Sequence, residues 1–204
     1  EAVAAQPCAS RDAVRRFYAR QGGYLALLYA LEATDFHFEN LIAAGEHPIL
    51  LDLEALFHPR IHETGAPSAD AGHTGLLYSV LGVGLLPQRI WDQDGGEGID
   101  ISGLGGSGGQ LTPHAALVFD GAGDELRMTR RRMPVPASHN LPTLDGRHPE
   151  LADYAGDLVA GFERTYRLLL AHRDALLAAG GPIAAFAAVV AAGSGLALWA
   201  WPVG

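Results

Sequence analysis

Apolar residues recur at helical spacing near the start of the chain. The run consists of Val14, Phe17, Tyr18, Tyr24, Leu25, Leu28 and Leu31, and a period of three to four residues is typical of an amphipathic helix. Ser10 precedes the run and is a favourable N-cap, because its hydroxyl oxygen can accept a backbone N–H of the first turn. Gly22 and Gly23 weaken a helix but permit close packing. The pattern predicts a helix from Ser10 to Leu31.

Residues 47 to 57 follow a different pattern, with Pro48 at the entry and β-prone apolar residues after it. This predicts a buried strand and its exit, so that Asp35 lies on a helix-to-strand connection. Residues 58 to 75 are rich in Pro, Gly and His and predict an exposed loop. His58 and His62 are four residues apart, but Pro59 follows the first and the Glu of a H-E-x-x-H motif is missing, so we expect no zinc site there.

The second half predicts a loop, a hairpin and a long helix. The segment 103–109 is rich in glycine but lacks the Gly-Lys-Ser/Thr of a phosphate-binding loop, which favours a flexible loop. Strands over 116–119 and 125–129 flank a turn at Asp120-Gly121. A helix begins at Pro149 and ends at Gly180-Gly181-Pro182. Its predicted buried stripe is Leu151, Leu158, Phe162, Tyr166 and Leu169.

The last segment, 183–204, is a divergent apolar tail. Ile183 to Trp201 is a run of 19 uncharged residues, long enough to span a bilayer. Its many Ala and Gly residues make it a poor candidate for insertion, so we do not expect a membrane partner. A buried terminal element and an end created by truncation or a frame shift are the alternatives.

Composition narrows the classes of function. A chain of 204 residues with 49% hydrophobic content is sufficient for one domain with a core. The net charge of −9 argues against a nucleic-acid partner, since phosphate binding needs clustered basic residues. The single cysteine, Cys8, excludes an internal disulfide, which fits a cytoplasmic location. All 14 basic residues are Arg, and the chain has no Lys.

Candidate chemistry is concentrated between residues 35 and 54. Asp35 and Asn40 have the D-x4-N spacing of a kinase catalytic loop, in which the Asp accepts the substrate proton and the Asn binds Mg²⁺. Asp52 follows the apolar run 49–51, where a second metal-binding Asp is expected. The alternative is structural: Asp35 would cap a helix, and Asn40 would occupy a left-handed turn position. The residues alone favour neither interpretation.

Ordered motifs from about residue 14 to 182 resemble the dehydratase domain of class II lanthipeptide synthetases. They are Phe17-Tyr-Ala-Arg-Gln-Gly22, Ala33-Thr-Asp-Phe-His-Phe-Glu-Asn-Leu-Ile-Ala-Ala-Gly-Glu-His-Pro48, Leu51-Asp-Leu-Glu54, Leu56-Phe-His-Pro59, Gly84-Leu-Leu-Pro87, Ser102-Gly-Leu-Gly-Gly106, Asn140-Leu-Pro142, and Gly161-Phe162 with Tyr166. Residues 1–182 are accordingly expected to form a partial domain of this kind.

The resemblance implies an α+β, mainly helical fold, like the large lobe of a lipid-kinase-like fold with short strands around the catalytic loop. It implies phosphorylation of Ser and Thr in a ribosomally made precursor peptide with ATP and Mg²⁺, then elimination of phosphate to give dehydroamino acids. By motif, Asp35 would accept or orient the hydroxyl proton, and His37 would contact phosphate or substrate. Asn40 and Asp52 would bind Mg²⁺. Glu54 belongs to the same segment, with a site role or structural support as alternatives.

The chain also departs from the family pattern. An R-x-x-x-R-x-T-like elimination segment is expected after the long helix, but residues 189–204 contain neither its Arg nor its Thr. A phosphate-binding Lys would have to come from a small lobe outside the chain, as would the zinc ligands of a cyclase domain. No nucleotide-binding residue is assigned. Two hypotheses follow: part of an active synthetase, or an inactive remnant or peptide-binding scaffold. A membrane-anchored module is a third, weaker one.

Overall fold

The structure, a computed structural model, describes residues 3–57, 75–76, 78–91, 98–112, 115–120 and 127–186. Its elements, with η for 3-10 helices, are α1 (Arg11–Ala30), η1 (Phe38–Asn40), β1 (Leu41–Ala44), β2 (His47–Leu50), η2 (Val80–Val83), β3 (Arg89–Ile90), β4 (Ile99–Asp100), β5 (Ala116–Asp120), β6 (Arg127–Arg131), η3 (Leu151–Tyr154), α3 (Ala155–Ala171) and α4 (Arg173–Leu177). Within these residues the strands form three antiparallel pairs, β1–β2, β3–β4 and β5–β6.

The first helix is as the sequence predicted. The Ser10 hydroxyl accepts the backbone N–H of Ala13 at 3.2 Å, a cap that typically stabilises a helix by about 1 kcal/mol. The apolar face is buried, with Val14 and Phe17 fully inaccessible. This face supplies much of the core beneath hairpin β1–β2.

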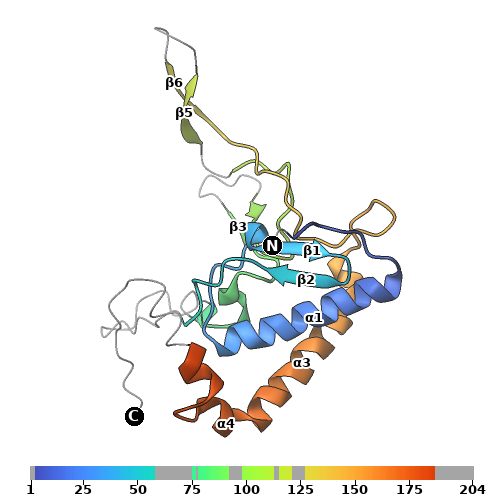
Figure 1. Ribbon diagram of the computed structural model, residues 1–204. Coiled ribbons are helices and arrows are strands. Elements are labelled where there is room, and N and C mark those ends of the chain that lie inside the picture. The colour runs from blue at the N-terminus through green and yellow to red at the C-terminus, as the bar shows by residue number, and fades with distance from the viewer. Residues whose placement is uncertain are drawn as a thin grey trace, which may run out of the picture.

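Two glycines bring α1 and α3 into close contact, and the helices lie side by side in Figure 1. A Cβ atom at Gly22 would collide with the backbone oxygen of Leu158, and one at Gly161 would collide with that of Ala19. The predicted close packing at Gly22 is confirmed. No residue larger than glycine fits at this crossing without moving a helix.

Hairpin β1–β2 differs from the prediction. Within the predicted strand and exit over 47–57, the strand ends at Leu50. The exit follows, in which the backbone at Asp52 takes a left-handed conformation (φ 50°) and residues 54–57 form a turn. Strand β1 was not predicted; it pairs with β2 from Leu41↔Leu50 to Ala44↔His47. Asp35 does lie between the first helix and the strands that follow it, as expected.

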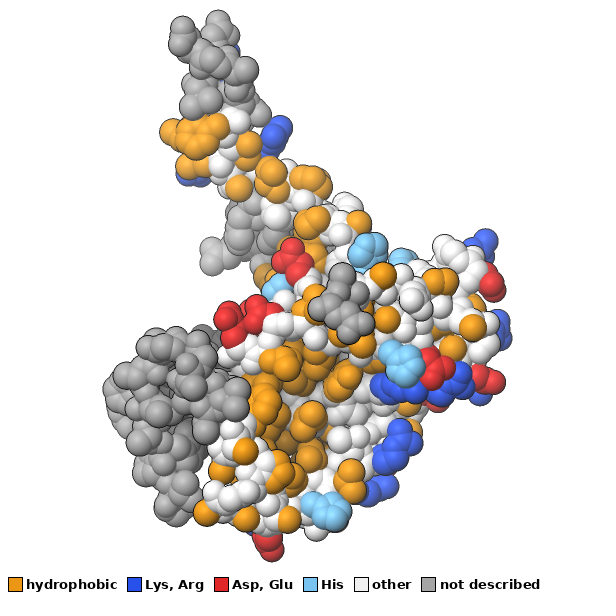
Figure 2. Space-filling model, in the orientation of Figure 1, with side chains coloured by type: hydrophobic (Ala, Val, Ile, Leu, Met, Phe, Trp, Pro, Cys, Tyr) orange, Lys and Arg blue, Asp and Glu red, His pale blue; other side chains and the backbone are white. Residues whose placement is uncertain are grey.

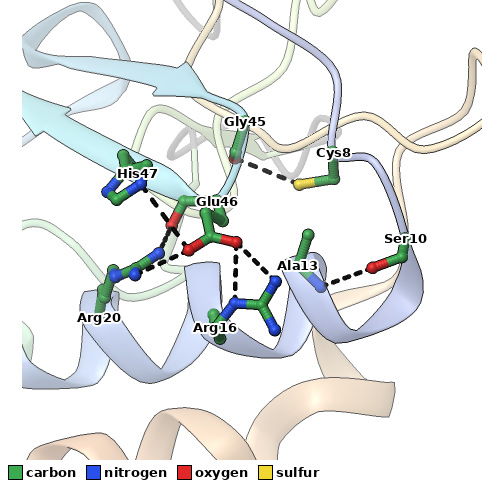
Figure 3. Close-up of polar contacts among 8 residues, drawn as sticks. All are labelled: Cys8, Ser10, Ala13, Arg16, Arg20, Gly45, Glu46 and His47. Carbon is green, nitrogen blue, oxygen red and sulfur yellow. Dashed lines mark hydrogen bonds and ion pairs between the residues drawn. The ribbon is translucent and has the colours of Figure 1, made fainter.

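The closed end of this hairpin is joined to α1 by an ion-pair cluster (Figure 3). Both Nε and Nη2 of Arg16 donate to one carboxylate oxygen of Glu46, at 2.8 and 2.6 Å. Arg20 lies 2.8 Å from the other oxygen and also donates to the Glu46 carbonyl. Gly45 provides the left-handed residue of the turn (φ 63°). The hairpin is thus held against the helix at the end remote from Asn40.

Glu46→Gln is expected to destabilise the protein at neutral pH but not in strong acid. Hydrogen bonds with Arg16, which has the larger effect, and with Arg20 lower the pKa of Glu46 from 4.5 to about 2. A folded-state pKa below the unfolded value gives stability that is complete above about pH 4.5 and is lost as the pH falls toward about 2. The check is the difference in urea midpoint between variant and wild type across this range. A difference that does not change with pH would contradict the assignment.

The predicted C-terminal helix is divided into three segments. Pro149 precedes η3 rather than opening the main helix, and His172 (φ −109°, ψ 12°) separates α3 from α4. The predicted stripe faces inward, but among its members only Leu158 is buried, with 8% exposure. Leu151, Phe162, Tyr166 and Leu169 are half-buried.

The hairpin predicted in the second half of the chain is present as β5–β6, which extends away from the helices in Figure 1. Its described strands run from 116 to 120 and from 127 to 131. Residues 125 and 126 of the predicted second strand lie outside the described residues. Across the described ranges no helix is long and apolar enough to cross a membrane. Most of the predicted tail (187–204) and most of the predicted 58–75 loop, with His58 and His62, lie outside the described residues.

Candidate active site

Asp35, His37 and Asn40 lie in the connection between α1 and β1, and the structure brings them together. The side-chain Nδ2 of Asn40 donates to the backbone oxygen of Asp35 at 2.9 Å. The Nε2 atom of His37 lies 3.8 Å from Oδ1 of Asp35 and 3.5 Å from Nδ2 of Asn40. The D-x4-N spacing therefore corresponds to a closed loop in which the Asn side chain holds the backbone of the Asp.

The ring of His37 is held in place by the backbone of its own loop. Nδ1 accepts the backbone N–H of Glu39 at 3.2 Å, and His37 is the N-cap of η1. The other ring nitrogen, Nε2, lies on the side of Asp35 and Asn40. The His37 side chain is 27% exposed and that of Asp35 69%. Both groups are accessible to a substrate.

The register of hairpin β1–β2 brings Asp52 to the same end as Asn40. The backbone N–H of Leu51 donates to the carbonyl of Asn40 at 2.9 Å, one step beyond the last strand pair. Asp52 follows directly. Its Oδ1 atom accepts the backbone N–H of Glu54 at 3.4 Å. Glu54 therefore contacts Asp52 through its main chain, which is a supporting contact.

The predicted catalytic carboxylate, Asp35, and the predicted metal-binding carboxylate, Asp52, both have an unusual backbone conformation. The described residues contain five non-glycine positions with positive φ, and Asp35 (67°) and Asp52 (50°) are two of them. A left-handed conformation costs a non-glycine residue roughly 1–2 kcal/mol, although Asp tolerates it better than most. Glycine would relieve this cost but has no carboxylate. Such residues cluster at functional sites, which favours the catalytic interpretation over simple capping.

Asn40 and Asp52 carry oxygen atoms of the chemical kind that Mg²⁺ prefers. Mg²⁺ is usually bound by one or two protein carboxylate or amide oxygens together with waters and phosphates. Asn40 uses its nitrogen on Asp35, which leaves its Oδ1 for a cation, and Asp52 supplies a carboxylate. In the described part of the chain, no group of three or more His, Cys, Asp or Glu could hold a metal ion. A two-ligand magnesium site is compatible with that finding.

The first part of the glycine-rich segment is a packed turn rather than the flexible loop that the sequence predicted, whereas residues 107–109 are exposed. Ser102, Gly103, Leu104 and Gly106 are buried against the 35–40 loop. The turn is ordered by Asp100, whose Oδ1 accepts the Ser102 backbone N–H at 2.9 Å and its hydroxyl at 2.6 Å. The contribution of this turn to the site was not predicted, because no local sequence pattern shows which segment the glycines pack against. The motif 102–106 was the available signal.

A largely apolar cavity of about 720 Å³ lies among α1, the exit of β2, α3 and α4. Figure 2 shows hydrophobic side chains gathered on this face of the molecule, with acidic side chains above them. None of the five predicted site residues lines the cavity, although Leu53 does. The cavity is thus separate from the polar end of the hairpin.

Comparison with known proteins agrees with the motifs. Residues 1–191 match the family described as "Domain of unknown function (DUF4135)". The chain belongs to this family. DUF4135 is associated with lanthipeptide synthetases, and the resemblance to a class II lanthipeptide synthetase domain is confirmed at that level.

A named relative supports the same class. The chain is 27% identical over 183 residues to the "Lacticin 481/lactococcin biosynthesis protein LcnDR2" of Lactococcus lactis subsp. lactis. The alignment covers 87% of the DUF4135 chain but 19% of that protein. The chain therefore spans about a fifth of the length of this relative.

Proposed function

We propose that the chain is the catalytic-loop portion of a lanthipeptide synthetase that phosphorylates Ser and Thr of a precursor peptide and then eliminates phosphate. The observation that carries the proposal is the joint placement of Asp35, His37, Asn40 and Asp52 at one end of hairpin β1–β2. Family membership supports it. A lipid-kinase-like large lobe and a cytoplasmic location are part of the same proposal.

Each side chain has a role consistent with its contacts. The exposed carboxylate of Asp35 accepts or orients the proton of the peptide hydroxyl. His37 presents Nε2 beside it and contacts the phosphate or substrate. Asn40 and Asp52 provide the oxygens that would hold Mg²⁺. Bound ATP with Mg²⁺ supplies the phosphoryl group, and the positive charge of the metal stabilises the negative charge that develops during transfer.

A second candidate, an inactive remnant or peptide-binding scaffold, is favoured by one sequence observation. The chain contains no Lys, whereas kinase-type sites use one to bind the α- and β-phosphates. The two candidates make different predictions for a polypeptide that also contains the flanking sequence. The synthetase would turn over ATP, and the remnant or scaffold would not.

For the 204-residue chain alone, we expect no ATP turnover. The test is co-expression with a Ser- and Thr-containing precursor peptide encoded near its gene, followed by mass spectrometry. The complete synthetase is expected to yield phosphorylated and dehydrated peptide, whereas the isolated chain leaves the peptide unchanged. Phosphate addition or water loss with the chain alone would show that its residues suffice. No modification by the complete synthetase would favour the scaffold.

A further inference from the structure

We propose that Asn140 is a positioning residue for the 35–40 loop, acting through the glycine-rich turn 102–106. The catalytic consequence of this inference rests on the proposed function of that loop. Asn140 lies in the connection between β6 and η3, far from the loop in sequence. Neither its spacing nor its residue type identified it as part of the site.

The Asn140 side chain holds two carbonyls of the turn. It is buried, with 2% exposure, and its Nδ2 donates to the carbonyls of Gly103 at 2.9 Å and Gly106 at 2.8 Å. A carboxamide presents two N–H bonds on one atom. Alanine would leave both buried carbonyls without these donors, which is costly inside a protein. Asn140 therefore determines the shape of the turn.

The glycine-rich turn 102–106 packs directly against the 35–40 loop. A Cβ atom at Gly106 would lie 2.7 Å from Cβ of Phe38, and one at Gly103 would lie 2.8 Å from the backbone oxygen of Phe36. The N–H of Phe38 donates to the Ile101 carbonyl at 3.0 Å. Phe36 and Phe38 flank His37, so a shift of the turn displaces His37 and its neighbour Asp35.

The segment that carries Asn140 also contacts the loop directly. The Ser138 hydroxyl donates to the carbonyl of Phe38 at 2.8 Å, and the His139 carbonyl accepts the N–H of Ala43 in β1 at 2.7 Å. The backbone of Phe38 is thus held on its N–H and its carbonyl by two different segments. Asn140 fixes their relative position, because it joins the 138–140 segment to the turn.

The kinetic test uses Asn140→Ala in the complete synthetase. We expect kcat for precursor phosphorylation to fall about 10- to 100-fold with KM for peptide and ATP nearly unchanged, since small displacements of catalytic groups have effects of this size. Val14→Ala, in the core face of α1, is the control for general destabilisation. It is expected to lower the melting temperature without changing kcat. Equal kcat values in wild type and Asn140→Ala, or equal losses in both variants, would overturn the proposal.

Amide hydrogen exchange gives a readout that does not depend on activity. Asn140→Ala is expected to speed exchange of peptides covering 36–41 and 102–106 more than Val14→Ala does. Unchanged exchange there would refute the positioning role even if activity fell. If Asp35→Asn proves fully active, the proposed function fails, whereas the exchange result still decides whether Asn140 holds the loop.

A second variant covers the case in which Asn140→Ala does not fold. Gly106→Ala keeps the carboxamide but places a methyl group against Phe38 and the Ser102 carbonyl, each at 2.7 Å. It should show the same fall in kcat and the same local increase in exchange. Wild-type kcat in a folded Gly106→Ala protein would contradict the proposed route from the turn to the loop.

Discussion

Asp35→Asn is expected to lower the rate of precursor phosphorylation by the complete synthetase more than ~100-fold, because a positioned proton acceptor typically contributes 10²–10⁴ in rate. The amide retains the size of the carboxylate but cannot accept the hydroxyl proton. The rate is measured by mass spectrometry of the peptide over time, with ATP and Mg²⁺ in excess. An unchanged rate would remove Asp35 from the mechanism.

The fold should survive this change, which makes the test specific. Asp35 is exposed and has φ 67°, and Asn tolerates a left-handed backbone as well as Asp does. Asp145 offers a matched control, because it is also an exposed aspartate with positive φ (51°) but lies outside the candidate site. Asp145→Asn should leave both the rate and the melting temperature unchanged. A similar loss of rate in both variants would point to backbone strain rather than proton transfer.

Local signals explain what could be predicted of the fold. The first helix has a cap and a continuous apolar period within one segment, and the structure reproduces both. Strand β1 was missed because four residues, Leu41 to Ala44, are too few to show a period, and its partner strand determines its conformation. A strand and its exit were predicted over 47–57, but the residue at which the strand ends was not, because apolar character continues past Leu50 whereas the backbone turns at Asp52. Hydrophobicity alone does not reveal that turn.

In the candidate site, too, contacts between residues close in sequence could be predicted, whereas contacts between distant residues could not. Asp35, His37 and Asn40 are close in sequence, so their spacing was sufficient to group them, and the structure places them in contact. The approach of Asp52 to Asn40 depends on the hairpin register. The link from Asn140 to Gly103 and Gly106 spans 34 to 37 residues. Contacts at that separation are determined by tertiary packing, which a single sequence does not display.

Stability of the site depends on a crossing that lies away from it. Hairpin β1–β2 is held to α1 by Glu46, and α1 is held to α3 at Gly22 and Gly161. Any change that separates the two helices therefore also loosens the support of the hairpin. The glycine positions at the crossing are the sites at which the smallest substitution is expected to have the largest effect on folding.

Gly161→Ala is expected to lower the free energy of unfolding by about 3 kcal/mol, at the upper end of the range for overpacked sites. The added methyl group would collide with the backbone oxygen of Ala19, and a main-chain atom within a helix cannot rotate away as a side chain can. Helices α1 and α3 must therefore move apart, with loss of the contacts around Leu158. The measurement is urea unfolding followed by circular dichroism.

Gly156→Ala is the control for this prediction because it lies in the same helix. A Cβ atom there would meet nothing within 4 Å, and alanine favours a helix over glycine by up to about 1 kcal/mol. This variant should therefore be as stable as wild type or slightly more stable. The opposite signs of the two effects separate packing at the crossing from helix propensity, since propensity alone would stabilise both variants. A stable Gly161→Ala protein would mean that the helices do not meet at this glycine.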